Sequence, residues 1–263
     1  MFTPMLSGHD TFYVVLSFLI SAVGAFVGLS ALVQLHAGSR AGRLFNLLSA
    51  SIALGGIGIW SMHFIGMLSL RMSMGVSYSL PETLVSLVAA IAASALALHA
   101  VASRQTLPRL LGAGTALGLA VCVMHYLGMY GMRFNGIFQW STALVGASVA
   151  IAIAAATAGL WLAFAARSLG ARLAASVVIA TAVCAMHYTG MAAATFVCTV
   201  ANPLAFPSGS GLITSLELPT LVTSLSLGMA AIIAIDQFMQ RLVSRADRAR
   251  RPTSPLRVRR ATR

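Results

Sequence analysis

The sequence predicts an all-α membrane protein with seven transmembrane helices: three tandem two-helix parallel repeats, followed by a seventh helix. Hydrophobic residues make up 59% of the chain and charged residues 8%, a composition far from that of a soluble globular domain. In addition, a Met-His-aromatic-x-Gly-Met pattern occurs three times, with its histidines 62 residues apart. A constant period of this kind indicates one structural unit copied in tandem.

Seven apolar stretches are each long enough to cross a hydrocarbon core of ~30 Å. We expect each to be helical, because backbone in lipid has to satisfy its own hydrogen bonds. The stretches cover residues 12–35, 44–70, 82–101, 110–132, 141–166, 172–198 and 219–240. No Lys or Arg precedes the first stretch and no small-residue cleavage site follows it, so we expect a retained helix rather than a signal peptide.

The arginines set the predicted orientation. All 17 basic residues are arginine, and 15 of them fall on one side of the membrane if the seven stretches alternate in direction. Because positive residues stay cytoplasmic, we expect the N-terminus outside and the C-terminus in the cytoplasm. The tail, residues 241–263, holds nine arginines and no apolar periodicity. We expect it to be disordered and to lie near anionic lipid, without binding nucleic acid. The absence of lysine, with heavy use of alanine, glycine and arginine, is typical of a GC-rich bacterial genome and favours a bacterial inner membrane.

The repeat sets the predicted domain organisation. One transmembrane domain covers residues 1–240, with repeats at about 12–73, 74–135 and 136–198 and an extra helix at 219–240. Each repeat has an even number of spans, so the copies are parallel and related by rotation about an axis along the membrane normal. We therefore expect the three motifs at one depth around a pseudo-threefold axis, at the outer ends of the second, fourth and sixth helices.

The motifs themselves predict a metal site. They are Met62-His63-Phe64-Ile65-Gly66-Met67, Met124-His125-Tyr126-Leu127-Gly128-Met129 and Met186-His187-Tyr188-Thr189-Gly190-Met191. On a helix, the histidine shares a face with the glycine and the second methionine, and a small residue on that face favours the bundle interior. Histidine is costly in lipid and thioether is a soft metal ligand, so their repeated pairing points to a metal, copper above all. Packing alone would accept Leu or Ile at each Met.

Two of the three cysteines keep a fixed place relative to the motifs. Cys122 and Cys184 each precede a motif histidine by three residues, a place that Trp60 holds in the first repeat. This place lies on the histidine's own face. Small buried thiols and metal ligands both stay open as interpretations. The cysteines have no CxxC spacing, so the sequence specifies no disulfide.

Residues 12–198 resemble the MHYT integral membrane sensor domain, named for the motif that stands intact at residues 186–189. The resemblance implies a bacterial membrane sensor that binds one or two copper ions and responds to oxygen, carbon monoxide or nitric oxide. The first two motifs lack the threonine of the name, so its hydroxyl is not expected to be a required ligand. By motif position, the implied ligands are His63, Met67, His125, Met129, His187 and Met191, with Met62, Met124 and Met186 as secondary candidates.

The function predicted from these features is a non-enzymatic copper-binding sensor. Members of the family often continue into a cytoplasmic cyclase, phosphodiesterase, kinase or DNA-binding domain, whereas this sequence ends 23 residues after the seventh predicted helix. We therefore expect a signal that passes to a separate partner. The other expected partners are the lipid bilayer and a diatomic gas. Three alternatives stay open: copper storage, delivery or transport; a haem protein with two of the histidines as axial ligands; and a structural repeat whose motifs only pack helices.

Overall fold

The computed structural model describes residues 6–36, 40–199 and 204–250. Seven helical spans in these ranges are long and apolar enough to cross a membrane, as predicted. The first two repeats' helices are α1 (Thr11–Val33), then α2 (Arg40–Ser51), η2 (Ile52–Ser61) and α3 (Met62–Leu68) in one continuous span, then α4 (Leu80–Ser103) and α5 (Leu107–Gly131). The remaining helices are α6 (Thr142–Ala165), α7 (Leu169–Ala192) and α8 (Leu218–Arg250), and a short 3-10 turn, η1 (Gln34–His36), follows α1.

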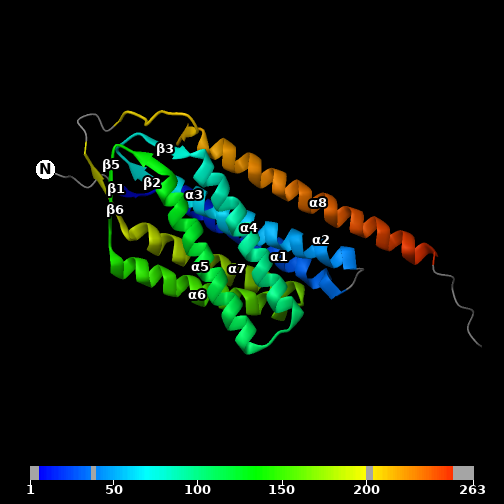
Figure 1. Cartoon of the computed structure of the whole chain (residues 1–263). Helices are drawn as coiled ribbons and strands as arrows, with labels where there is room; N and C mark the ends of the chain where they lie inside the picture. The colour runs from blue at the N-terminus through cyan, green and yellow to red at the C-terminus, as the bar shows by residue number, and fades with distance from the viewer. Residues whose placement is uncertain (1–5, 37–39, 200–203, 251–263) are drawn as a thin grey trace, which may run out of the picture.

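The helices form one elongated bundle, in which the short strands gather at one end (Figure 1). We call this the motif end, because the histidine motifs close the helices there, and the opposite end the arginine end. Local sequence explains several helix starts. Ser141 and Ser168 accept hydrogen bonds from backbone N–H groups three residues on, and Asp10 caps α1 in the same way through the N–H of Phe12. The corresponding starts in the second repeat carry proline in the first turn.

The first repeat departs from regular helix geometry. Its second span contains a π-helical segment, η2, immediately before the histidine motif, whereas α5 and α7 are α-helical throughout. Gly24 of α1 lies so close to η2 that a Cβ there would overlap the backbone of Gly58. Two glycines thus allow α1 and η2 to approach at backbone distance, as small residues do in membrane helix pairs.

Three small antiparallel sheets close the motif end. They pair β1 (Leu6–His9) with β2 (Leu70–Met72), β3 (Val76–Ser79) with both β4 (Met132–Phe134) and β7 (Leu212–Thr214), and β5 (Gly136–Trp140) with β6 (Ala194–Cys198). We predicted helices only; the strands lie in the connections between spans, where backbone groups outside a helix pair with one another.

We call these three sheets and their connections the cap. Two ion pairs involve arginines of the cap, Arg71 of β2 and Arg133 of β4. Arg71 contacts Asp10 at 3.0 Å and Arg133 contacts Glu82 at 2.8 Å. The hydrogen bond from Arg71 is the largest cause of the lowered pKa of Asp10, whereas burial lowers the pKa of the neighbouring His9. These two arginines are the ones that the sequence places apart from the other fifteen, and each has an acidic partner.

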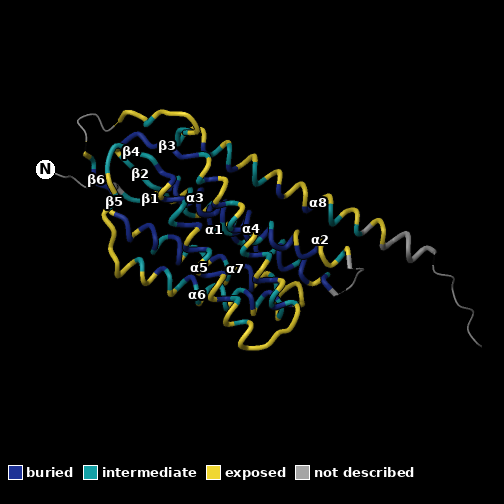
Figure 2. The backbone as a smooth tube through the Cα atoms, viewed as in Figure 1, coloured by how far each residue is buried: buried dark blue, intermediate teal, exposed yellow. Residues whose placement is uncertain are grey.

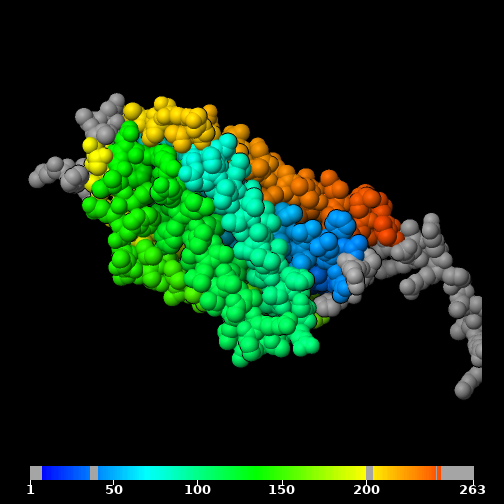
Figure 3. Space-filling model, in the orientation of Figure 1, coloured from blue at the N-terminus to red at the C-terminus, as the bar shows by residue number. Residues whose placement is uncertain are grey.

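Helix α8 packs along the second span of the first repeat, against α2, η2 and α3 (Figure 1). In the space-filling view it forms a ridge on the outside of the bundle (Figure 3). The helix reaches Arg250, ten residues beyond the predicted end at residue 240. The prediction of disorder from residue 241 is therefore wrong for residues 241–250, where arginine and alanine, both good helix formers, continue the helix. Residues 251–263 lie outside the described residues.

The core runs along the bundle axis, and the outer faces of the spans are exposed to the surroundings (Figure 2). Large apolar side chains such as Leu96, Val123 and Trp161 are exposed on those faces. A lipid-facing surface is expected to look like this, because hydrocarbon and Leu are equally apolar. The chain is a multi-pass membrane protein, consistent with an inner-membrane location.

Candidate metal centre

The three motif histidines meet at the centre of the bundle. His63 comes from α3, His125 from α5 and His187 from α7, and each is at most 1% exposed. Their Nδ1 atoms form a triangle with sides of 3.1, 3.1 and 3.3 Å. The predicted equivalence of the repeats is thus confirmed at the histidines. Among the described residues, this is the one group of three or more His, Cys, Asp or Glu side chains that could hold a metal ion.

The size of the triangle fits a metal ion. A point equidistant from the three Nδ1 atoms lies about 1.8 Å from each of them, given those sides. Imidazole nitrogen binds Zn²⁺ at ~2.0–2.1 Å, so a small outward shift of each ring would accommodate an ion of that size. The geometry suits three nitrogen ligands around one ion.

The protons of the triangle lead to the same conclusion. Each ring nitrogen has one in-plane site, which is either an N–H group or a lone pair. Only two of the three converging Nδ1 atoms can therefore pair in a good N–H···N bond. The third Nδ1 then directs its lone pair at another lone pair, or its N–H at another N–H. A cation at the centre satisfies three lone pairs at once. The rings then carry their protons on Nε2 and stay neutral, which is the form that binds metal.

The motif glycines receive these rings. A Cβ at Gly128 would overlap Nε2 of His63, a Cβ at Gly190 would overlap Nε2 of His125, and a Cβ at Gly66 would overlap Nε2 of His187. Each histidine thus packs its far edge against the glycine of another repeat's motif. The three Nε2 atoms are buried without a hydrogen-bond partner in the described part of the chain. The glycine therefore has a steric role: it lets the imidazole reach the axis.

A ring of serine hydrogen bonds links each repeat to the next. The hydroxyl of Tyr126 lies 2.7 Å from Ser148 Oγ, and the hydroxyl of Tyr188 lies 3.0 Å from Ser17 Oγ. Both serines donate to backbone carbonyls three residues earlier, so the tyrosines act as donors. The last repeat thereby closes on the first, which holds the three histidine helices around one axis.

The first motif keeps this link with different residues. Phe64 has no hydroxyl, and Trp60 instead donates its Nε1–H to Ser86 Oγ at 3.0 Å. Ser17, Ser86 and Ser148 are each the seventh residue of their helix, α1, α4 and α6. Sequence reasoning missed these serines, although the 62-residue spacing between Ser86 and Ser148 carried the signal. The structure also explains why Trp60 stands where the other repeats have cysteine.

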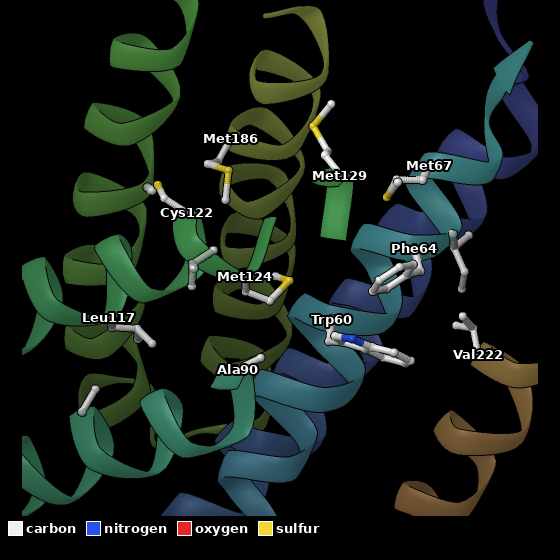
Figure 4. Close-up of a cluster of buried hydrophobic side chains, with 14 of the residues drawn as sticks. Trp60, Phe64, Met67, Ala90, Leu117, Cys122, Met124, Met129, Met186 and Val222 are labelled. Atoms are coloured by element: carbon white, nitrogen blue, oxygen red, sulfur yellow. The ribbon is translucent and has the colours of Figure 1, made fainter. Parts of the chain in front are cut away.

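The predicted methionine ligands are all buried. Met67, Met129 and Met191 are 0–1% exposed, and the three that precede the histidines, Met62, Met124 and Met186, are 1–3% exposed. Figure 4 shows Met67, Met124, Met129 and Met186 in a cluster with Trp60, Phe64, Leu117 and Cys122. Met186 also lines an apolar cavity of about 70 Å³ between the repeats. The structure thus brings the three histidines together and buries all six motif methionines.

Two of the three cysteines, Cys122 and Cys184, are free thiols. Cys122 is buried in the main apolar cluster, while Cys184 is half-buried. The other histidines stand apart from the triangle: His9 lies in the cap, with Nδ1 2.8 Å from Ser69 Oγ.

The fold and the histidine triangle define a membrane domain built from three helix-pair repeats around a candidate metal centre. The sequence profile of the MHYT family, described as a bacterial signalling protein N-terminal repeat, matches residues 56–114 and 118–176. The chain belongs to this family. No solved structure matches the chain.

Curated signalling proteins match over most of this chain. The bifunctional diguanylate cyclase/cyclic di-GMP phosphodiesterase MucR of Pseudomonas aeruginosa is 32% identical over 73% of the chain, which spans 29% of the relative. The cyclic di-GMP phosphodiesterase NbdA of the same organism is 34% identical over 82% of the chain and 27% of its own length. The signalling protein YkoW of Bacillus subtilis is 32% identical over 74% of the chain and 25% of its own length. The chain thus corresponds to less than a third of each relative.

Proposed function

We propose that this domain is a membrane sensor that binds copper at the histidine triangle and detects a diatomic gas, such as oxygen, carbon monoxide or nitric oxide, or a redox change. The observation that carries the proposal is the convergence of three buried Nδ1 atoms from three repeats. The signalling relatives support a role in signal transduction rather than in metabolism. We propose that the domain itself catalyses no reaction and acts on a partner.

The choice of copper rests on the chemistry of the donors. Imidazole binds copper and zinc, and thioether adds a preference for Cu(I). Met67, Met129 and Met191, each one helical turn after its histidine, are the proposed additional ligands, with Met62, Met124 and Met186 as secondary candidates. When bound, copper would supply an ion that can change oxidation state or take up a small ligand. The burial of the histidines supports a role for the protein in excluding water from that ion.

The histidine separation argues against the haem alternative. Two axial histidines of a haem lie on opposite faces of a macrocycle. Nδ1 atoms 3.1–3.3 Å apart leave no space for a macrocycle between them. A purely structural role is also disfavoured, because without an ion the three converging Nδ1 atoms can make only one good hydrogen bond among themselves, which leaves a buried nitrogen unsatisfied.

Metal content of the detergent-purified protein tests the proposal. Wild type is compared with a His63→Ala/His125→Ala/His187→Ala variant and with His99→Ala, which removes an exposed histidine of α4 as the matched control. We expect one or two equivalents of copper in wild type and in the control, and none in the triple variant. Equal copper in all three proteins would refute the site.

A second experiment separates sensing from copper handling. The membrane part of MucR is exchanged for residues 1–250 of this chain, and cyclic di-GMP is measured with and without nitric oxide or oxygen. If the domain is a sensor, the cyclic di-GMP level should depend on the gas in the chimera with intact histidines and should not depend on it once the three histidines are replaced. An output that never depends on gas, combined with a change in cellular copper when the gene is deleted, would favour copper storage, delivery or transport.

A further inference from the structure

A groove at the arginine end runs between α1 and α8. Its volume is about 630 Å³, and its floor includes Ile57 of η2. Along α1 the lining extends from Leu19 to Gln34, which is 15 residues or about 22 Å at the helical rise. One leaflet of a ~30 Å hydrocarbon core is about 15 Å deep, so the groove is long enough for the acyl chain of a lipid.

At the arginine end of this groove lies a guanidinium that has no acidic partner among the described residues. Arg172, in the first turns of α7, lines the groove, and its Nε is buried without a hydrogen-bond partner in the described residues. The two ion pairs found among those residues involve other arginines. The Arg172 guanidinium carbon lies 5.9 Å from the centre of the Phe26 ring, which also lines the groove. The guanidinium thus lies against an apolar wall, and no carboxylate of the described residues pairs with it.

Two amide side chains lie near the same end of the groove. Gln34 at the end of α1 and Gln237 of α8 line the groove there, whereas most of its other lining side chains are apolar. Leu19, Val23 and Leu227 of the groove walls are 51–66% exposed, as expected for walls that open toward lipid. The groove is elongated and mostly apolar, which suits an acyl chain, and it ends at an arginine and two amides, which suit a polar headgroup.

We propose that this groove binds one anionic phospholipid, with an acyl chain between α1 and α8 and the phosphate on Arg172. A guanidinium binds phosphate through two parallel N–H groups, and the buried Nε–H supplies one of them. Anionic headgroups are favoured over zwitterionic ones because none of the described lining residues offers a carboxylate to pair with a choline or ethanolamine cation. The lipid would touch Ile57, six residues before His63 on the same helical span.

Native mass spectrometry of the full chain, delipidated in detergent, tests the proposal. The probes are phosphatidylglycerol and phosphatidylcholine, added at equal concentration, and the readout is the lipid retained after collisional activation. We expect one tightly held phosphatidylglycerol in wild type. Arg172→Gln should weaken it by about 10-fold or more, as expected for loss of a charge-assisted hydrogen bond.

Matched variants make the result specific. Arg109→Gln removes an exposed arginine at the start of α5 and should bind lipid like wild type. Ala230→Phe fills the groove, whereas Ala231→Phe adds the same ring to an exposed position of α8 that does not line it. Only Ala230→Phe should release the lipid. Size-exclusion profiles verify that each variant is folded.

Three outcomes would overturn the inference. Equal retention of the two lipids in wild type would mean unselective coating of the surface. Equal loss in Arg172→Gln and Arg109→Gln would assign the effect to net charge. A dimer that persists as lipid is added, and that Ala230→Phe disrupts, would mean that a second copy of the chain fills the groove. None of these readouts depends on copper, so failure here leaves the proposed function untouched.

Discussion

The packing of each imidazole against a glycine predicts that one added methyl group will strongly weaken metal binding with little loss of stability. In Gly128→Ala, the new Cβ overlaps Nε2 of His63. The ring must move by roughly 1 Å to regain ordinary van der Waals contact. Metal–ligand distances tolerate changes of about 0.2 Å, so that shift removes His63 from the triangle. We expect metal affinity to fall by about 100-fold, the upper range for disturbing a ligand's orientation.

The stability of Gly128→Ala should change much less. The obstructing atom is the end of a side chain that can rotate, so the cost is near the lower end of the ~1–3 kcal/mol typical of overpacking. Alanine also gains up to about 1 kcal/mol of helix propensity over glycine. The two terms largely cancel, and thermal unfolding in detergent should shift by a few degrees at most.

Gly112→Ala is the matched control, because Gly112 lies on the same helix and a Cβ there meets nothing within 4 Å. Competition with a chromogenic copper chelator measures affinity for wild type and both variants. The reasoning is refuted if Gly128→Ala binds copper as tightly as Gly112→Ala. It is equally refuted if Gly128→Ala unfolds, since the steric conflict would then lie in the helix packing rather than in the imidazole.

Three further predictions concern the scaffold. Gly24→Ala should destabilise the protein by about 3 kcal/mol or more, because its Cβ meets the backbone of Gly58, which cannot rotate away; thermal unfolding beside Gly112→Ala measures this. Tyr188→Phe and Ser17→Ala should each cost about 1 kcal/mol, and the double variant clearly less than their sum, because both remove one hydrogen bond; an additive double-mutant cycle would contradict the bond. If the arginine bias sets the orientation, a reporter that works only in the cytoplasm should be active when it is fused after residue 263. Activity of a reporter that works only outside the cytoplasm would reverse the predicted topology.

Much of the architecture could be predicted because its signals are local. Apolar length gives the spans, and the 62-residue period gives the equivalence of His63, His125 and His187. The helical spacing of Gly66 and His63 indicates a shared face toward the interior, and both residues are buried as expected. These inferences need no knowledge of how one helix is placed against another.

The features that were missed all depend on contacts between helices. Spacing within one helix cannot tell that Gly66 receives the ring of His187, since that contact joins the first repeat to the third. The link from Trp60 to Ser86 is hidden for the same reason, because a tryptophan replaces the hydroxyl donor used in the other repeats. The strands of the cap are too short and too far apart in sequence to show periodicity.

The first repeat departs from the symmetry of the other two, and its departures in length and helix geometry lie between the start of α1 and the motif histidine. From the start of its first helix to the motif histidine, the first repeat takes 52 residues (Thr11 to His63), whereas the second (Leu80 to His125) and the third (Thr142 to His187) each take 45. The seven extra residues precede a histidine that still reaches the common triangle. They therefore fall within the stretch between the start of α1 and the motif, which also holds η1 and the π-helical segment η2.

Helix α8 contacts the first repeat along this same irregular span. Met229 of α8 occupies the space beside Gly56 of η2, and Ser226 lies 2.8 Å from Ser61. Nearer the arginine end, Ser49 of α2 donates to Asp236 at 2.7 Å. A π-helical segment is less favourable than α-helix and often marks a functional site. The asymmetry therefore coincides with two roles of one helical span: it supplies one of the three equivalent histidines, and it packs against α8.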